Sequence, residues 1–116
     1  VMDGSSASFC MMFNEANLVQ QDANKKIMVI KKEVEVRDGK KFAKISPNPD
    51  TEFTFSIDFN HPSIGFQKFH LNFSKQNYID QISRARTFGF LKDFQMLRSR
   101  NLALGASLDN AVVMDE

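Results

Sequence analysis

Apolar residues recur along the chain at two spacings, that of a β-strand and that of an α-helix. The clearest stretch has the strand spacing, every second residue, and lies in the middle of the chain. In Phe53–Phe59 apolar residues alternate strictly with polar ones, as they do in a half-buried β-strand. Phe69–Phe73 repeats the alternation, and Asn60–Ser63 between the two runs contains turn-forming Asn and Pro. The pattern therefore predicts two antiparallel strands joined by a turn.

A further set of strands is predicted before this pair. Ile27–Ile30 is a continuous apolar run and indicates a buried strand, and Val34 and Val36 then alternate with charged residues. Asp38–Gly39 is a strong hairpin signal, and Phe42–Ile45 continues the sheet on its other side. We expect these strands to form an antiparallel sheet.

Three stretches have helical character. Asp3–Ala16 indicates a helix that is apolar on most sides and needs burial, and the polar Asn17–Lys26 that follows indicates a linker. Ser74 can cap a second helix, and a third begins near Leu91 and closes at Asn101. The inward stripes are Tyr78, Ile79 and Ile82 in the second helix and Phe90, Leu91, Phe94 and Leu97 in the third. Helices packed on one face of an antiparallel sheet make an α+β fold.

The last part of the chain forms its own unit. Phe88–Phe90 precedes the third helix, and Ala111–Met114 after the turn Gly105–Ser107 indicates a buried strand. We therefore expect a strand-helix-strand insert added to the sheet.

Composition limits the class of protein. With 116 residues, 42% of them hydrophobic, the chain has the length of one domain and can support a modest core. Its net charge of +1 argues against nucleic-acid or membrane-surface binding through bulk charge. A local basic cluster is either a solvated helix face or an anion site. Its members are Arg84, Arg86, Lys92, Arg98 and Arg100.

The single Cys10 excludes an internal disulfide framework and fits a reducing compartment, so we expect a cytoplasmic location and a small buried thiol. The longest apolar stretch, Ala7–Phe13, is too short to form a transmembrane segment. The chain opens on Val1 and stops at Asp115–Glu116 directly after an apolar strand. We interpret it as a piece of a longer protein.

No complete metal site is expected within the chain. The only imidazoles are His61 and His70, nine positions apart with Pro62 between them, which is not the spacing of a zinc-binding helix. We expect His61 to be a turn residue bonded to backbone, and His70 to be a strand residue facing solvent.

Several longer motifs carry a resemblance to a known family. They are Met2–Ser5, Ile57–Pro62, Arg84–Phe90, Leu97–Arg100, Leu104–Ser107 and Asp109–Ala111. With them the chain resembles, nearly end to end, the UDP-3-O-acyl-N-acetylglucosamine deacetylases, zinc enzymes of lipid A biosynthesis. The resemblance implies two similar α+β domains that face each other across the active site. Residues 1–24 would be the end of the first domain and a linker, and 25–116 the N-terminal part of the second, with an acyl-passage insert at about 87–114.

The resemblance also implies where the catalytic groups lie. The family's zinc is held by two histidines and an aspartate, one histidine beside a catalytic glutamate in the first domain. The other two ligands lie in a His-Lys-x-x-Asp helix beyond this C-terminus, and neither motif occurs in this sequence. Zinc, general base and general acid are therefore assigned to no residue of this chain, which we expect to be inactive and zinc-free by itself.

Thr87 matches the family's threonine beside the zinc, where a hydroxyl donor stabilises the oxyanion. Read without the resemblance, Thr87 is a strand threonine bonded to backbone. Seven residues match the wall of the acyl passage, and without the family they would be ordinary core: Phe88, Phe90, Phe94, Ala103, Ala106, Leu108 and Val113. Phe59 and Lys41 match positions that receive the nucleotide, by stacking and by charge. Their alternatives are a core ring and a solvent-exposed hairpin lysine.

The function implied is removal of acetate from UDP-3-O-acyl-N-acetylglucosamine. The partners are this UDP-linked acylated glucosamine and the remainder of the same enzyme. The alternative is a non-enzymatic α+β binding module with an apolar groove for lipid or peptide. Uncovered apolar surface also predicts that the chain associates with itself, as a dimer or a swapped assembly.

Overall fold

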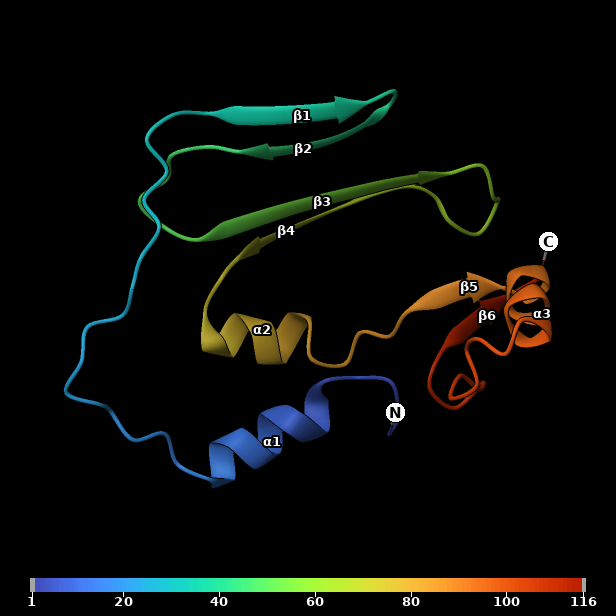
Figure 1. Cartoon of the computed structure of the whole chain (residues 1–116), viewed down its shortest axis with the longest axis horizontal. Helices are drawn as coiled ribbons and strands as arrows, with labels where there is room; N and C mark the ends of the chain where they lie inside the picture. Colours follow the sequence, from blue (N-terminus) through green and yellow to red (C-terminus); the bar gives the residue numbers. More distant parts are fainter. Residues whose placement is uncertain (1, 116) are drawn as a thin grey trace.

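The computed structural model describes residues 2–115 and has an α+β arrangement, as predicted (Figure 1). The elements in chain order are α1 (Ala7–Glu15), β1 (Val34–Asp38), β2 (Lys41–Ile45), β3 (Glu52–Phe59), β4 (Gly65–Asn72), α2 (Lys75–Gln81), β5 (Phe88–Phe90), α3 (Leu91–Ser99) and β6 (Val112–Met114). Helices α1 and α2 lie on the same side of the β3–β4 pair in Figure 1.

The two predicted antiparallel pairs are confirmed. Strands β1 and β2 pair from Val34↔Ile45 to Asp38↔Lys41, so the loop has two residues, and Gly39 in it has a φ of +59° that favours glycine. Strands β3 and β4 pair from Glu52↔Asn72 to Phe59↔Gly65. Within residues 2–115 the strands form three separate two-stranded sheets, so the two hairpins do not join into one ladder.

The strand-helix-strand insert is also confirmed. Strands β5 and β6 pair in parallel, from Phe88↔Val112 to Phe90↔Met114, and α3 lies in the connection between them. Parallel strands need such a crossover because the chain must return to the same end of the sheet before it can pair again. Asn101 follows α3 with a φ of +57°, the left-handed ending expected from the sequence.

One strand prediction is wrong. Ile27–Ile30 forms no strand, and Ile27 and Met28 are 81% and 84% exposed. An apolar run specifies a strand only where a second strand offers hydrogen bonds, and charged Lys25–Lys26 and Lys31–Lys32 flank this run on both sides. The first paired residue is Val34.

Helix ends follow the polar residues only in part. At α2 the Ser74 Oγ accepts a hydrogen bond from the Asn77 N–H at 3.0 Å, which confirms the predicted cap. Helix α1 is shorter than the predicted Asp3–Ala16: it begins at Ala7, and its N-cap Ser6 makes no capping bond because its hydroxyl is used elsewhere.

Few side chains are buried. Among the described residues, Ile64 and Leu71 are the buried apolar ones and Ser5 and Ser83 the buried polar ones, and Cys10 is half-buried rather than buried. The Cα radius of gyration of 18.3 Å exceeds the ~13 Å of a compact domain of this size. The elements therefore pack locally and leave wide apolar faces open, including most of α1.

Candidate functional site

The insert contains an apolar hollow of about 270 Å³. Its lining residues are Leu91, Phe94, Arg98, Ala106, Ser107, Leu108 and Val113. Arg98 and Ser107 are the polar members, and the Arg98 guanidinium lies 4.9 Å from the centroid of the Phe94 ring in a cation–π contact. The hollow is therefore a largely apolar space with one cation at its wall.

The lining follows from how the insert folds. Leu91, Phe94 and Arg98 fall on one face of α3 because they are three and four residues apart, and Val113 comes from β6. The third side is the loop around Ser107, which Asn110 holds in place. The Asn110 Oδ1 accepts from the Ser107 N–H at 2.9 Å, and its Nδ2 donates to the Gly105 carbonyl at 2.9 Å.

The structure brings together four of the seven residues predicted to line an acyl passage. Phe94, Ala106, Leu108 and Val113 line the hollow, whereas the other three, Phe88, Phe90 and Ala103, do not. Sequence reasoning missed Leu91, Arg98 and Ser107 as lining residues. Helical spacing was the signal for the first two, because each shares the face of α3 that carries Phe94.

Phe88 and Phe90 belong instead to an aromatic cluster with Phe59 and His61. The Phe59 ring centroid lies 5.4 Å from that of Phe88, edge to face, and 6.2 Å from that of Phe90. The His61 ring lies 5.5 Å from Phe90. The end of β3 therefore packs against β5, and Phe59 is in this structure both a packing residue and 37% exposed.

Thr87 directly precedes β5 and is exposed. Its carbonyl accepts from the Val112 N–H at 2.9 Å, a bond that belongs to the first pair of the β5–β6 ladder, Phe88↔Val112. Its hydroxyl makes no hydrogen bond with any other of residues 2–115. The backbone of Thr87 is thus fixed while its side-chain donor stays available.

The two histidines occupy the places expected of them. His61 lies in the turn after β3, where its Nδ1 accepts from the Ser63 N–H at 3.2 Å. The proton therefore resides on Nε2, which donates to the Asp115 carbonyl at 3.0 Å. His70 is exposed on β4 and lies 2.9 Å from the Thr54 hydroxyl. Across the described part of the chain no three His, Cys, Asp or Glu side chains gather closely enough to hold a metal ion.

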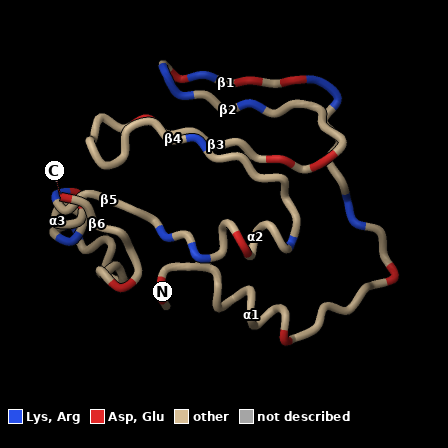
Figure 2. The backbone as a smooth tube through the Cα atoms, turned by 180° about the vertical axis from the view of Figure 1, so that it is seen from behind, with Lys and Arg blue, Asp and Glu red and all other residues tan. Residues whose placement is uncertain are grey.

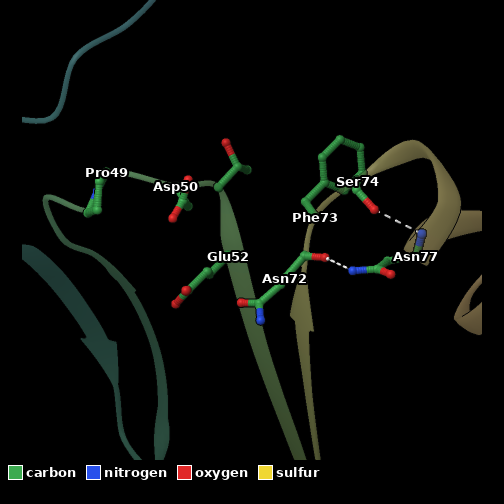
Figure 3. A pocket seen from close by; sticks show the side chains of 8 residues that line it. Pro49, Asp50, Glu52, Asn72, Phe73, Ser74 and Asn77 are labelled. Carbon is green, nitrogen blue, oxygen red and sulfur yellow. Dashed lines mark hydrogen bonds between the residues drawn. The ribbon is translucent and has the colours of Figure 1, made fainter.

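Lys41 is exposed at the start of β2 and lines neither the apolar hollow nor a second, polar one. The second hollow, of about 560 Å³, lies where β3 begins and β4 ends (Figure 3). There Asn77 donates from Nδ2 to the Asn72 carbonyl at 2.7 Å. None of the predicted site residues lines it. Its residues are Pro49, Asp50, Thr51, Glu52, Asn72, Phe73, Ser74 and Asn77.

Comparison with known proteins settles the family. The sequence model described as UDP-3-O-acyl N-acetylglycosamine deacetylase matches residues 1–116. The chain belongs to this family. Proteins named UDP-3-O-acyl-N-acetylglucosamine deacetylase are similar over all 116 residues: those of Campylobacter hominis and Sulfurimonas denitrificans at 60% identity and that of Campylobacter fetus at 56%. The chain spans 40% of the length of each of these deacetylases.

Membership in the deacetylase family confirms the resemblance carried by the sequence motifs. The roles of the individual site residues and the division into 1–24 and 25–116 stay predictions. In the described residues no helix has both the length and the apolar character needed to cross a membrane.

Proposed function

We propose that this chain is part of a deacetylase that removes acetate from UDP-3-O-acyl-N-acetylglucosamine in lipid A biosynthesis, in the cytoplasm. Within it, residues 25–116 form the N-terminal part of a second domain whose insert receives the substrate's acyl chain. The observation that carries the proposal is the apolar hollow between α3, β6 and the Ser107 loop, in a chain of this family.

An acyl chain needs an apolar enclosure more than it needs polar partners. Burying an alkyl chain contributes about 0.8 kcal/mol per methylene, and no hydrogen bond has to be matched along it. Phe94, Leu108 and Val113 are apolar residues that line the hollow and offer such a surface. The Arg98 charge sits at that wall, and it can face the polar end of a bound chain.

Thr87 supplies the polar counterpart. In amide hydrolysis negative charge grows on the carbonyl oxygen, and a fixed hydroxyl donor nearby stabilises that charge. The hydrogen bond between the Thr87 carbonyl and Val112 fixes the backbone that carries this hydroxyl. We assign Thr87 the role of oxyanion donor.

The family's catalytic metal is zinc, which supplies an activated water when bound. The described residues do not fit a zinc site, because His61 and His70 are engaged with Asp115, Ser63 and Thr54 on different elements. The ligands implied by the resemblance lie outside this sequence. The contribution of this chain is therefore to bind the acyl chain and the nucleotide, through Phe59 and Lys41, and to position a donor.

Replacing Leu108 by Asp in the complete deacetylase tests the acyl site. A carboxylate in the hollow should cost affinity for long-chain substrates at least tenfold and leave short-chain substrates nearly unchanged. Leu104→Asp is the matched control, because Leu104 is about as exposed as Leu108, at 69% and 78%, but does not line the hollow. Equal loss for short and long chains, measured as KM with each substrate, would show that Leu108 lines no acyl passage.

A further inference from the structure

The segment Asp3–Ser6 is held by several hydrogen bonds, and the proposed function gives it no role. Ser5 and Ser83, at 9% and 3% exposure, are the two buried polar residues among those described. The Ser6 N–H donates to the Ser83 carbonyl at 2.9 Å, and the Ser6 hydroxyl lies 3.0 Å from the Tyr78 hydroxyl. These bonds fix the segment on the end of α2, more than seventy residues away in sequence.

Asp3 joins this segment to the residue before Thr87. Its Oδ1 accepts from the Ser5 N–H at 3.1 Å and from the Ser5 hydroxyl at 2.9 Å, which orients the carboxylate. Its Oδ2 lies 3.6 Å from Nη2 of Arg86. Hydrogen bonds from Ser5 and the charge of Arg86 lower the pKa of Asp3. Figure 2 shows the basic stretch before β5 passing the N-terminal end of the chain.

Gly4 joins the same segment to the other strand of the insert. Its φ of +79° is a conformation that side chains disfavour, and a Cβ at this position would overlap the backbone carbonyl of Asn110. Because the obstacle is backbone rather than a flexible side chain, only glycine lets the segment approach the loop so closely. Asn110 in turn holds the Ser107 loop and lies two residues before Val112.

We infer that Asp3–Ser6 is a positioning clamp for Thr87. Through Asp3 it holds Arg86, next to Thr87, and through Gly4 it abuts Asn110, close to the Val112 that bonds the Thr87 carbonyl. Each partner of this bond therefore has a residue close to it in sequence that contacts the segment Asp3–Ser6. The catalytic effect of the clamp rests on the proposed role of Thr87. The clamp itself does not depend on that role.

Amide exchange at Val112 tests the clamp without reference to activity. In the complete protein that carries this chain, Gly4→Ala should speed exchange of the Val112 N–H at least tenfold, because the segment must move away from Asn110. Gly39→Ala is the control, since Gly39 also has a positive φ but has open space around it. If Gly4→Ala and Gly39→Ala change Val112 exchange equally, there is no clamp.

The charge contact is tested by a milder change that keeps the fold. Asp3→Asn retains an acceptor for Ser5 but removes the charge that faces Arg86, so we expect Val112 exchange to rise roughly threefold. Asp22→Asn, in the exposed linker, makes the same charge change and should have no effect. Arg86→Gln should match Asp3→Asn, and the double variant should add little, because both remove one interaction. If the effects of Asp3→Asn and Arg86→Gln on exchange add in the double variant, Asp3 and Arg86 do not interact.

Turnover separates the clamp from the proposed function. With Thr87 present, Asp3→Asn should lower kcat several-fold with KM unchanged, and in a Thr87→Val background it should lower kcat less than twofold. Equal losses in both backgrounds would overturn the positioning role, whatever Thr87 does. If Thr87→Val alone keeps full turnover, the role of Thr87 fails, and the exchange result still decides the clamp.

Discussion

At the scale of single residues, Thr87 combines a fixed backbone with a side chain that the surrounding structure does not use. Its carbonyl is bonded to Val112, and its neighbours Arg86 and Phe88 are held by Asp3 and by the Phe59 ring. Because the backbone is already fixed, little conformational entropy is lost when this hydroxyl donates to a charge that develops near it.

Replacing Thr87 by Val in the complete deacetylase should remove the donor and keep the shape. Loss of one oxyanion donor typically lowers turnover ~10²–10³-fold, and we expect the lower end because the proposed zinc would share the charge. Thr87→Ser keeps the donor and should lose little, and KM should change little in either variant. Steady-state kinetics with circular dichroism as a folding control checks this. Near-normal turnover of Thr87→Val would mean that Thr87 is only structural.

Asp3 predicts a pH dependence of stability. Its pKa is lowered below the ordinary value of 3.8 in the folded chain, chiefly by the Ser5 hydrogen bonds. A group with a depressed folded pKa contributes stability that is fully present above 3.8 and is lost as the pH falls through the lower, folded value. Urea unfolding should therefore show that the wild type loses more stability than Asp3→Asn as the pH falls from 3.8 through this lower value. Asp22→Asn should follow the wild type; if Asp3→Asn does so too, Asp3 is not bonded in the folded state.

At the scale of elements, the sequence predicts those whose signals are local. The Asp38–Gly39 turn, the Ser74 cap and the left-handed Asn101 all form as expected, because each depends on the conformational preference of a few residues. The alternation in β3 is a local signal too. A single hairpin accommodates it, because alternate residues of a strand lie on opposite faces of the β3–β4 pair.

Elements that depend on distant partners were predicted less well. Ile27–Ile30 has the composition of a strand but no partner strand, and α1 starts four residues later than expected because Ser6 bonds Tyr78 and Ser83 instead. The site residues also divide into those with a local sequence signal and those without one. Helical spacing places Leu91 beside Phe94 and could have placed Arg98 there too, but nothing local indicates that Phe88 and Phe90 face Phe59 rather than the hollow.

At the scale of the whole molecule, the exposed apolar surface is large and the buried core is small. The α1 residues Phe9, Met11, Met12 and Phe13 are 47%, 64%, 49% and 67% exposed. Each of the three two-stranded sheets also has unpaired outer edges among the described residues. Exposed apolar patches and free strand edges both favour association.

We therefore expect the chain by itself to associate at high concentration, as a dimer or a swapped assembly, and the α1 face to be part of the contact. Phe13→Glu should weaken association at least ~10-fold, because burying one Phe side chain contributes about 1.5–3 kcal/mol and a carboxylate opposes burial. Gln20→Glu, in the exposed linker, is the control for added charge and should leave association unchanged. Light scattering over a concentration series checks both variants. A monomer at every concentration would mean that the open apolar faces do not meet, and equal weakening by both variants would mean that net charge, not the α1 face, governs association.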